Sequence, residues 1–185
     1  MVYTNAERAR KLAARTAFRS CLLVCCAFFA SPATAFDAAG VRSTSAEALA
    51  LIKEGADRSP SFSGLLERIS ESSGIVYVEF GYCALGHLNG CLLPFVVPST
   101  GGRYLRILVT PDRTRESHDR LIALIAHELQ HALEVLAHPE VVDVDSMLEM
   151  YSRIGVPLAG RKGYETSAAH AVQDAVLAEL HVNRP

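Results

Sequence analysis

The sequence predicts one α+β domain behind a short N-terminal export segment. The chain has 185 residues, the length of a single domain. Apolar residues recur at three- and four-residue steps in several stretches, as in helices, whereas residues 75–109 are rich in β-branched and aromatic side chains, as in strands. With 50% hydrophobic residues and a net charge of −2, the composition excludes an intrinsically disordered chain.

The first 35 residues have the three parts of a secretory signal peptide. Five basic residues and one acid precede the apolar run 21–30, and Ala33-Thr34-Ala35 is an A-x-A processing site. We therefore expect cleavage after Ala35 and export to the periplasm or the cell exterior. The alternative is a membrane anchor, but the apolar run spans only about 15 Å as a helix, half of a bilayer core of about 30 Å. We expect no membrane anchor after cleavage.

Removing this segment changes the composition. Of the 18 basic and 20 acidic residues, residues 36–185 keep 13 and 19, which gives a formal charge of −6. This acidic balance argues against a nucleic-acid partner. Only Cys83 and Cys91 remain of the five cysteines, and in an oxidising compartment we expect them to form a disulfide. Two free thiols are the alternative.

The N-terminal half of this domain is expected to hold two helices and a small antiparallel sheet. Thr44 and Glu47 have the spacing of a capping box for a helix to about Asp57. Ser59-Pro60 ends it, and a second helix covers about 62–70. The expected strands are 75–80 and 92–97, paired as a hairpin around the cysteine loop, and 104–109.

The C-terminal half is expected to be helical. From about His118 the apolar residues keep a helical spacing for nearly twenty residues, until His138-Pro139. Ser146 and Glu149 indicate another capped helix that ends near Gly155, and residues 165–181 form the last one.

Two histidines and a glutamate interrupt the long apolar helix. His127 and His131 are four residues apart, so both imidazoles lie on one helix face, about 6 Å apart, where one Zn²⁺ can bind both. Glu128 lies about 100° round the helix from His127. It borders such a metal without ligating it, where a carboxylate can accept a proton from water.

Chance is a poor explanation of this H-E-x-x-H spacing, since ordinary residue frequencies give it in fewer than about one per cent of chains of this length. The alternative is a structural pair of histidines whose hydrogen bonds are satisfied inside the core. Buried imidazole and carboxylate groups need partners, however, and a metal supplies one.

His127-Glu128-Leu129-Gln130-His131, with small and aliphatic residues on both sides, resembles the active-site helix of the zincin metallopeptidases. The resemblance covers this helix closely and indicates no particular subfamily. It implies a zincin-like fold, a Zn²⁺ held by His127 and His131, Glu128 as general base and proton donor, and a third protein ligand further along the chain.

Several residues are candidates for the third ligand. The metzincin extension is disfavoured, because it needs Gly at position 134 and His at 137, where this chain has Glu134 and Ala137. Glu134 lies about 7 to 8 Å along the axis from the midpoint of the two histidines, too far for its carboxylate if the helix continues. We prefer Glu165, which would open the last helix in an arrangement that resembles the gluzincins. Glu134 is the main alternative, and further ones are Glu140, Asp143 and His170. The gluzincin acid four residues after that Glu is Ala169 here, so another group must orient an imidazole.

The residue that stabilises the oxyanion is left open. The candidates are Tyr164, which we prefer, and Tyr151, Arg161 and His170. Three other histidines, His87, His118 and His138, are interpreted as surface residues.

These expectations describe an exported zinc metallopeptidase that hydrolyses a peptide or protein substrate, with residues 104–109 as the edge strand that receives it. One alternative is hydrolysis of a non-peptide amide, or a weakly active zinc-binding protein, on the same site. Another is an interaction module with structural zinc. Structural zinc usually has four protein ligands, and no cysteine lies near the motif helix in sequence.

Overall fold

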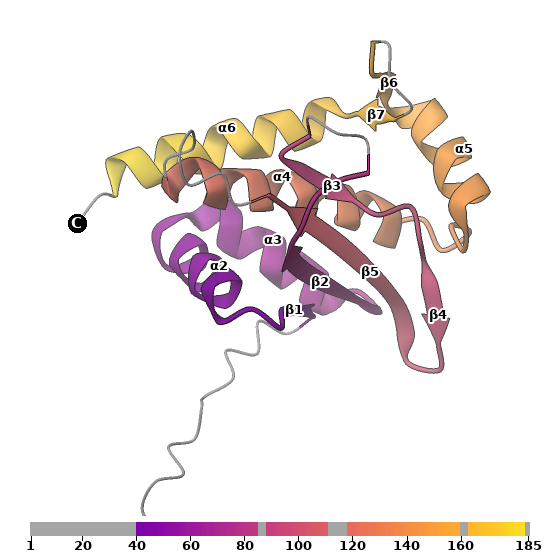
Figure 1. Cartoon of the computed structure of the whole chain (residues 1–185), viewed down its shortest axis with the longest axis horizontal. Coiled ribbons are helices and arrows are strands. Elements are labelled where there is room, and N and C mark those ends of the chain that lie inside the picture. The colour runs from indigo at the N-terminus through magenta and orange to yellow at the C-terminus, as the bar shows by residue number, and fades with distance from the viewer. Residues whose placement is uncertain (1–39, 85–87, 111–117, 160–162, 184–185) are drawn as a thin grey trace, which may run out of the picture. The chain divides into compact units, whose positions relative to one another are not determined.

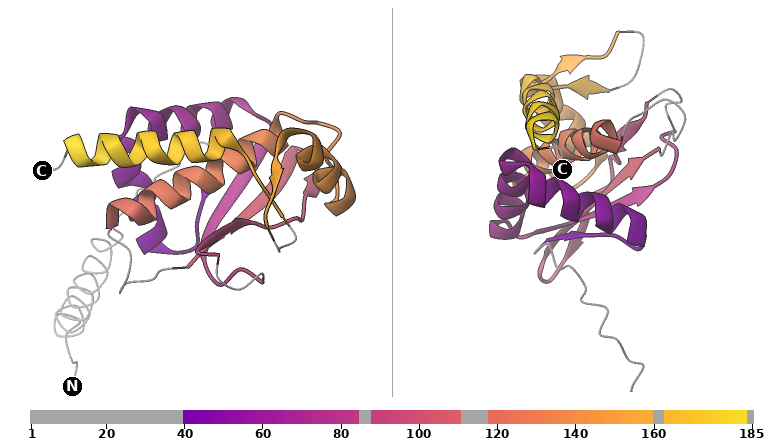
Figure 2. Two further views of the ribbon diagram at one scale, coloured as in Figure 1. Left: turned by 90° about the horizontal axis from the view of Figure 1, so that it is seen from above. Right: turned by 90° about the vertical axis from the view of Figure 1, so that its left-hand side faces the viewer.

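A mixed sheet with helices on one face forms the body of the structure (Figures 1 and 2). The computed structural model describes residues 40–84, 88–110, 118–159 and 163–183, so the predicted signal segment lies outside it. No helix in these ranges is long and apolar enough to span a membrane. The elements in chain order are β1 (Val41–Arg42), α2 (Ala46–Arg58), α3 (Pro60–Glu71), β2 (Gly74–Phe80), β3 (Gly90–Leu92), β4 (Val97–Ser99), β5 (Gly102–Val109), α4 (His118–Leu136), α5 (Val144–Ile154), β6 (Val156–Pro157), β7 (Tyr164–Glu165) and α6 (Ser167–Val182).

The main sheet has the strand order β1-β2-β5-β3, and β4 also pairs with β5. β5 runs parallel to β2 and antiparallel to β3 and β4. Alternate residues of β2 and β5 are buried under the helices, because side chains of a strand point to opposite faces in turn. The buried set is Val76, Val78, Leu105, Ile107 and Val109.

The α+β class is confirmed, but several predictions about the sheet are wrong. The predicted strand 92–97 is replaced by two short strands, β3 (Gly90–Leu92) and β4 (Val97–Ser99), and neither forms a hairpin with β2. The chain instead leaves β2, passes through β3 and β4, and returns as β5 between β2 and β3. The sheet is therefore mixed rather than antiparallel. Residues 104–109 belong to β5, which has partners on both sides. The edge of the sheet next to β5 is therefore formed by β3, and β1 forms the opposite edge.

The helices lie close to their predicted positions, but three of their starts differ. Ser45, not Thr44, caps α2, since its side chain accepts from the Ala48 N–H. The capping box of α5 is Asp143 with Ser146, not Ser146 with Glu149. Thr166 caps α6, so Glu165 precedes that helix instead of opening it. In each case the capping residue lies one to three residues from the expected one.

Helix α4 lies at the centre of the packing. It contacts α2, α3 and α6 as well as β2, β3 and β5, and α6 runs along it (Figures 1 and 2). Most of its residues are therefore buried on every side, including His127, Glu128 and His131. A helix that is buried on every side normally carries apolar residues on every side. Each polar side chain of α4 therefore needs a hydrogen-bonding or charged partner nearby.

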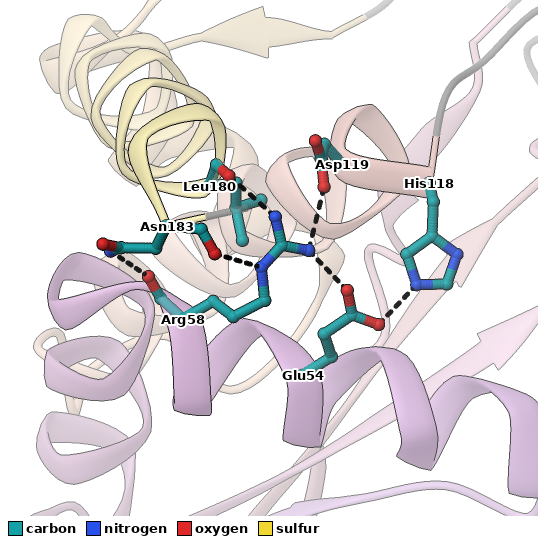
Figure 3. A network of polar contacts seen from close by, with 6 residues as sticks. All are labelled: Glu54, Arg58, His118, Asp119, Leu180 and Asn183. Atoms are coloured by element: carbon teal, nitrogen blue, oxygen red, sulfur yellow. Dashed lines mark hydrogen bonds and ion pairs between the residues drawn. The ribbon is translucent and has the colours of Figure 1, made fainter. Parts of the chain in front are cut away.

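Arginines from other elements hold both ends of α4. At its beginning, the Arg58 guanidinium donates to the carboxylates of Glu54 and Asp119 and to the Leu180 carbonyl, which joins α2, α4 and α6 (Figure 3). At its end, Arg103 of β5 donates to four carbonyl oxygens, at 2.7 to 3.1 Å, of residues 135, 136, 138 and 141. A cation here also complements the negative end of the helix dipole.

We predict that Arg103→Met lowers the free energy of unfolding by about 2–4 kcal/mol, because it leaves these carbonyls without their charged donor. Arg106→Met is the matched control in the same strand. Arg106 pairs with Glu79, but its side chain is 57% exposed, so its loss is expected to cost less than about 1 kcal/mol. Urea unfolding of the two variants measures the difference. Equal losses would show that Arg103 does not anchor α4.

Candidate metal centre

Three side chains from two distant segments meet beside α4. His127 and His131 lie one turn apart on that helix, and Glu165 comes from β7. Each offers one ligand atom, and these atoms all lie within 4.8 Å of one another. Glu165 Oε2 is 3.1 Å from His127 Nε2 and 3.8 Å from His131 Nε2. The three residues that the sequence analysis preferred as ligands therefore form a group that could hold a metal ion.

The donor atoms of this group suit a metal. Glu165 Oε2 is buried and makes no hydrogen bond within the described residues, although buried polar atoms normally have a partner. In addition to the Nε2 atoms of His127 and His131, His170 Nε2 lies near the same oxygen, at 3.3 Å. Imidazole nitrogen together with one carboxylate oxygen is a ligand set of Zn²⁺ and of neighbouring first-row metals.

Glu134, the main alternative as third ligand, binds the far side of one imidazole. Its Oε2 lies 2.9 Å from His131 Nδ1, whereas His131 Nε2 faces Glu165. Its Oε1 accepts from Thr166 Oγ1 at 2.7 Å. Glu134 therefore orients the His131 ring and ties it to the residue directly after Glu165. This is the orienting carboxylate that Ala169 does not supply.

Neighbouring groups of opposite charge shift the pKa values of His131 and Glu165. Burial lowers the pKa of His131, but its hydrogen bond to Glu134 and its contact with the Glu165 carboxylate outweigh burial and raise this pKa to about 9. Burial raises the pKa of Glu165, and its contacts with His127 and His131 outweigh that effect, so the pKa lies well below its ordinary value. The site thus favours positive charge beside Glu165, and a metal ion would displace the proton from His131.

Glu128 lies between the metal group and the edge strand β3. It is buried, and the Leu92 backbone N–H donates to its carboxylate. Burial raises its pKa to about 7, although both histidines act in the opposite direction. A Cβ added at Gly90 would lie only 2.7 Å from Glu128 Oε1. Glycine at this position therefore lets β3 approach the carboxylate.

A cavity of about 370 Å³ opens beside Glu128, His131 and Glu165. Its walls come from β3 and the residues after it, from α5, and from the β6–β7 hairpin. Cys83 and Cys91 line it and form the predicted disulfide, with their Cα atoms 6.1 Å apart. The disulfide fixes the start of β3 to the segment that follows β2.

The other predicted candidates have varied surroundings. Tyr164 lines the cavity, and its role as oxyanion donor stays a prediction. Tyr151 is buried, and its hydroxyl donates to the His131 carbonyl. Asp143 caps α5, and Glu140 lies 2.9 Å from His138. His118 pairs with Glu54. Arg161 and His87 lie outside the described residues.

Sequence reasoning missed the roles of Glu134, Gly90 and Thr166. A signal existed for Glu134, since residues three apart on a helix are neighbours and it follows His131 by three. None existed for Gly90 or Thr166, whose partners are distant in the chain.

No protein-family model, curated protein or solved structure matches this chain.

We predict that Glu165→Ala weakens Zn²⁺ binding more than Glu134→Ala does. With a metal bound by this group, the first variant would remove a ligand, whereas the second would remove a group that orients one, for which a loss of about 10- to 100-fold is typical. Competition with a chromophoric chelator measures both affinities, and Glu149→Ala on the exposed face of α5 is the control. A larger loss of zinc affinity for Glu134→Ala would show that Glu134 is the ligand and that Glu165 is not.

Proposed function

We propose that this chain is a zinc metallopeptidase with a zincin-like active site. One observation carries the proposal. The H-E-x-x-H histidines of α4 and Glu165, which lies 34 residues beyond His131, point their ligand atoms at one another, and Glu128 lies beside them at the wall of a cavity. A purely structural histidine pair does not require this combination.

Each residue would have a separate task. His127, His131 and Glu165 would hold the zinc ion, which would polarise a carbonyl group and make a water molecule more acidic. Glu128 would accept the proton of that water and return it to the leaving amine. Glu134 would keep the His131 ring in position through Nδ1.

The edge strand β3 supports a peptide as the substrate. Leu93 N–H donates to the Arg106 carbonyl, and the Asn89 carbonyl accepts from Thr110 N–H. Because such bonds alternate along an antiparallel strand, Gly90 and Leu92 turn their backbone groups away from β5. The Leu92 N–H already donates to Glu128. An extended peptide could therefore pair with this edge through the Gly90 backbone groups and the Leu92 carbonyl.

The Cys83–Cys91 disulfide supports the proposed export, because disulfides persist in oxidising compartments such as the periplasm and the cell exterior.

We predict that Glu128→Gln keeps zinc but loses peptide cleavage by about a hundredfold or more, since the amide cannot accept the proton. Metal analysis of the purified protein and cleavage of a mixed peptide library provide the two measurements. Cleavage at the wild-type rate would exclude Glu128 as the base. Failure of the wild-type protein to bind stoichiometric zinc would refute the proposal altogether.

Gly90→Ala tests the same role without altering Glu128. The new methyl group would displace the Glu128 carboxylate, so cleavage should fall while zinc stays bound. Gly101→Ala is the matched control, because a Cβ at that position meets no atom within 4 Å.

A second candidate function, a zinc-binding protein without hydrolytic activity, is favoured by His170. Its Nε2 lies 3.3 Å from Glu165 Oε2, and its ring centroid lies 5.3 Å from that of His127. With His170 as a fourth protein ligand, the site would have no open position for a substrate.

His170→Ala separates the two functions. For an open catalytic site we expect zinc affinity to change less than about threefold, because His170 is not a ligand. A loss comparable to that of Glu165→Ala, as is typical of a removed ligand, would instead establish the closed site. Chelator competition measures both variants under the same conditions.

A further inference from the structure

The cavity beside Glu128 has strongly uneven chemistry. The only acidic or basic side chains that line it within the described residues are Glu128, His131 and Glu165, all at the end beside the metal group. The rest of the lining is apolar apart from two tyrosines. These apolar residues include Leu92, Pro94, Val144, Met147, Leu148 and Leu158.

This lining discriminates between side chains. A charged or amide side chain that entered the apolar part would lose its hydration without gaining a partner. An aliphatic or aromatic side chain has no hydrated polar group to lose, and its binding would remove further apolar surface from water. The volume of about 370 Å³ lies near the lower end of the range for small-ligand sites, about 300 to 1,000 Å³, which suits one large side chain with its adjoining backbone.

The walls are held by bonds independent of any ligand. The disulfide ties Cys83 to Cys91 in β3. Across the cavity, Tyr151 of α5 is anchored through its hydroxyl to the His131 carbonyl at 3.0 Å, and Met147 is buried in the core. A preformed cavity binds without the cost of ordering its walls.

We propose that this cavity is a specificity pocket for a large apolar side chain, aliphatic or aromatic, next to the peptide bond that is cleaved. The substrate class is then peptides with such a residue beside the scissile bond. This statement about the substrate rests on the proposed peptidase function, whereas the binding of an apolar side chain does not.

The test compares two neutral amides of similar shape, N-acetyl-L-leucinamide and N-acetyl-L-asparaginamide, by NMR titration of the isotope-labelled protein. We expect leucinamide to bind about tenfold or more tightly, since only the asparagine amide loses hydration, with shifts at Cys91, Leu148 and Tyr164. Neither probe is charged, so repulsion from Glu128 and Glu165 cannot produce the difference.

Two variants on α5 provide a matched pair. Leu148 lines the cavity and is 44% exposed, whereas Ile154 does not line it and is 45% exposed. Leu148→Asn is expected to weaken leucinamide binding about fivefold or more, and Ile154→Asn less than twofold, because only the first places an amide in the pocket. Both substitutions replace surface apolar groups, and thermal unfolding verifies that both variants fold. If Leu148→Asn fails to fold, Leu148→Ala, with an expected loss of about threefold, replaces it.

The cleavage measurement uses two peptides that differ only in Leu or Asn beside the scissile bond, and we expect kcat/KM to favour Leu by about tenfold, for the same reason. Leucinamide binding without cleavage of any peptide would overturn the metallopeptidase proposal and support the pocket. Equal binding of the two amides, or shifts outside the cavity, would overturn the pocket whatever the cleavage result.

Discussion

Helix α4 carries imidazole and carboxylate side chains into a position that is buried on all sides. The surrounding structure has to supply hydrogen-bonding and charged partners for them. His131 receives Glu134 on one ring nitrogen and faces Glu165 with the other. Glu134 in turn accepts from Thr166, and Glu128 accepts from the backbone of β3. Because an unpaired polar group inside a core is costly, these contacts constrain where β3, β7 and α6 can pack.

The position of α4 is constrained as strongly along its axis. Arg58 fixes its beginning to α2 and α6, and Arg103 fixes its end to β5. A shift by one residue would move each side chain by about 100° around the axis and would carry the histidines away from Glu165. Residues far from the site thus help to set distances inside it.

Local sequence signals predicted what depends on local geometry. The helical spacing from His118 onwards and the two histidines four residues apart needed only the helix period, and α4 covers the expected residues. Glu165 was predicted as the third ligand because it is a carboxylate and because its place in the sequence resembles an arrangement in which a later segment adds that ligand. The sheet order was not predictable in this way, because β5 inserts between β2 and β3 through pairing across the chain. For the same reason, β3 was not recognised as the edge strand.

The contact between Glu134 and Thr166 joins α4 to the residue that caps α6. A metal held by His127, His131 and Glu165 would join the same two parts of the chain a second time. Because the ligands come together only in the folded chain, metal binding would stabilise the folded state. The metal centre would then stabilise the packing of α6 against α4 as well as serve as a reaction site. Metal content and resistance to unfolding would rise and fall together.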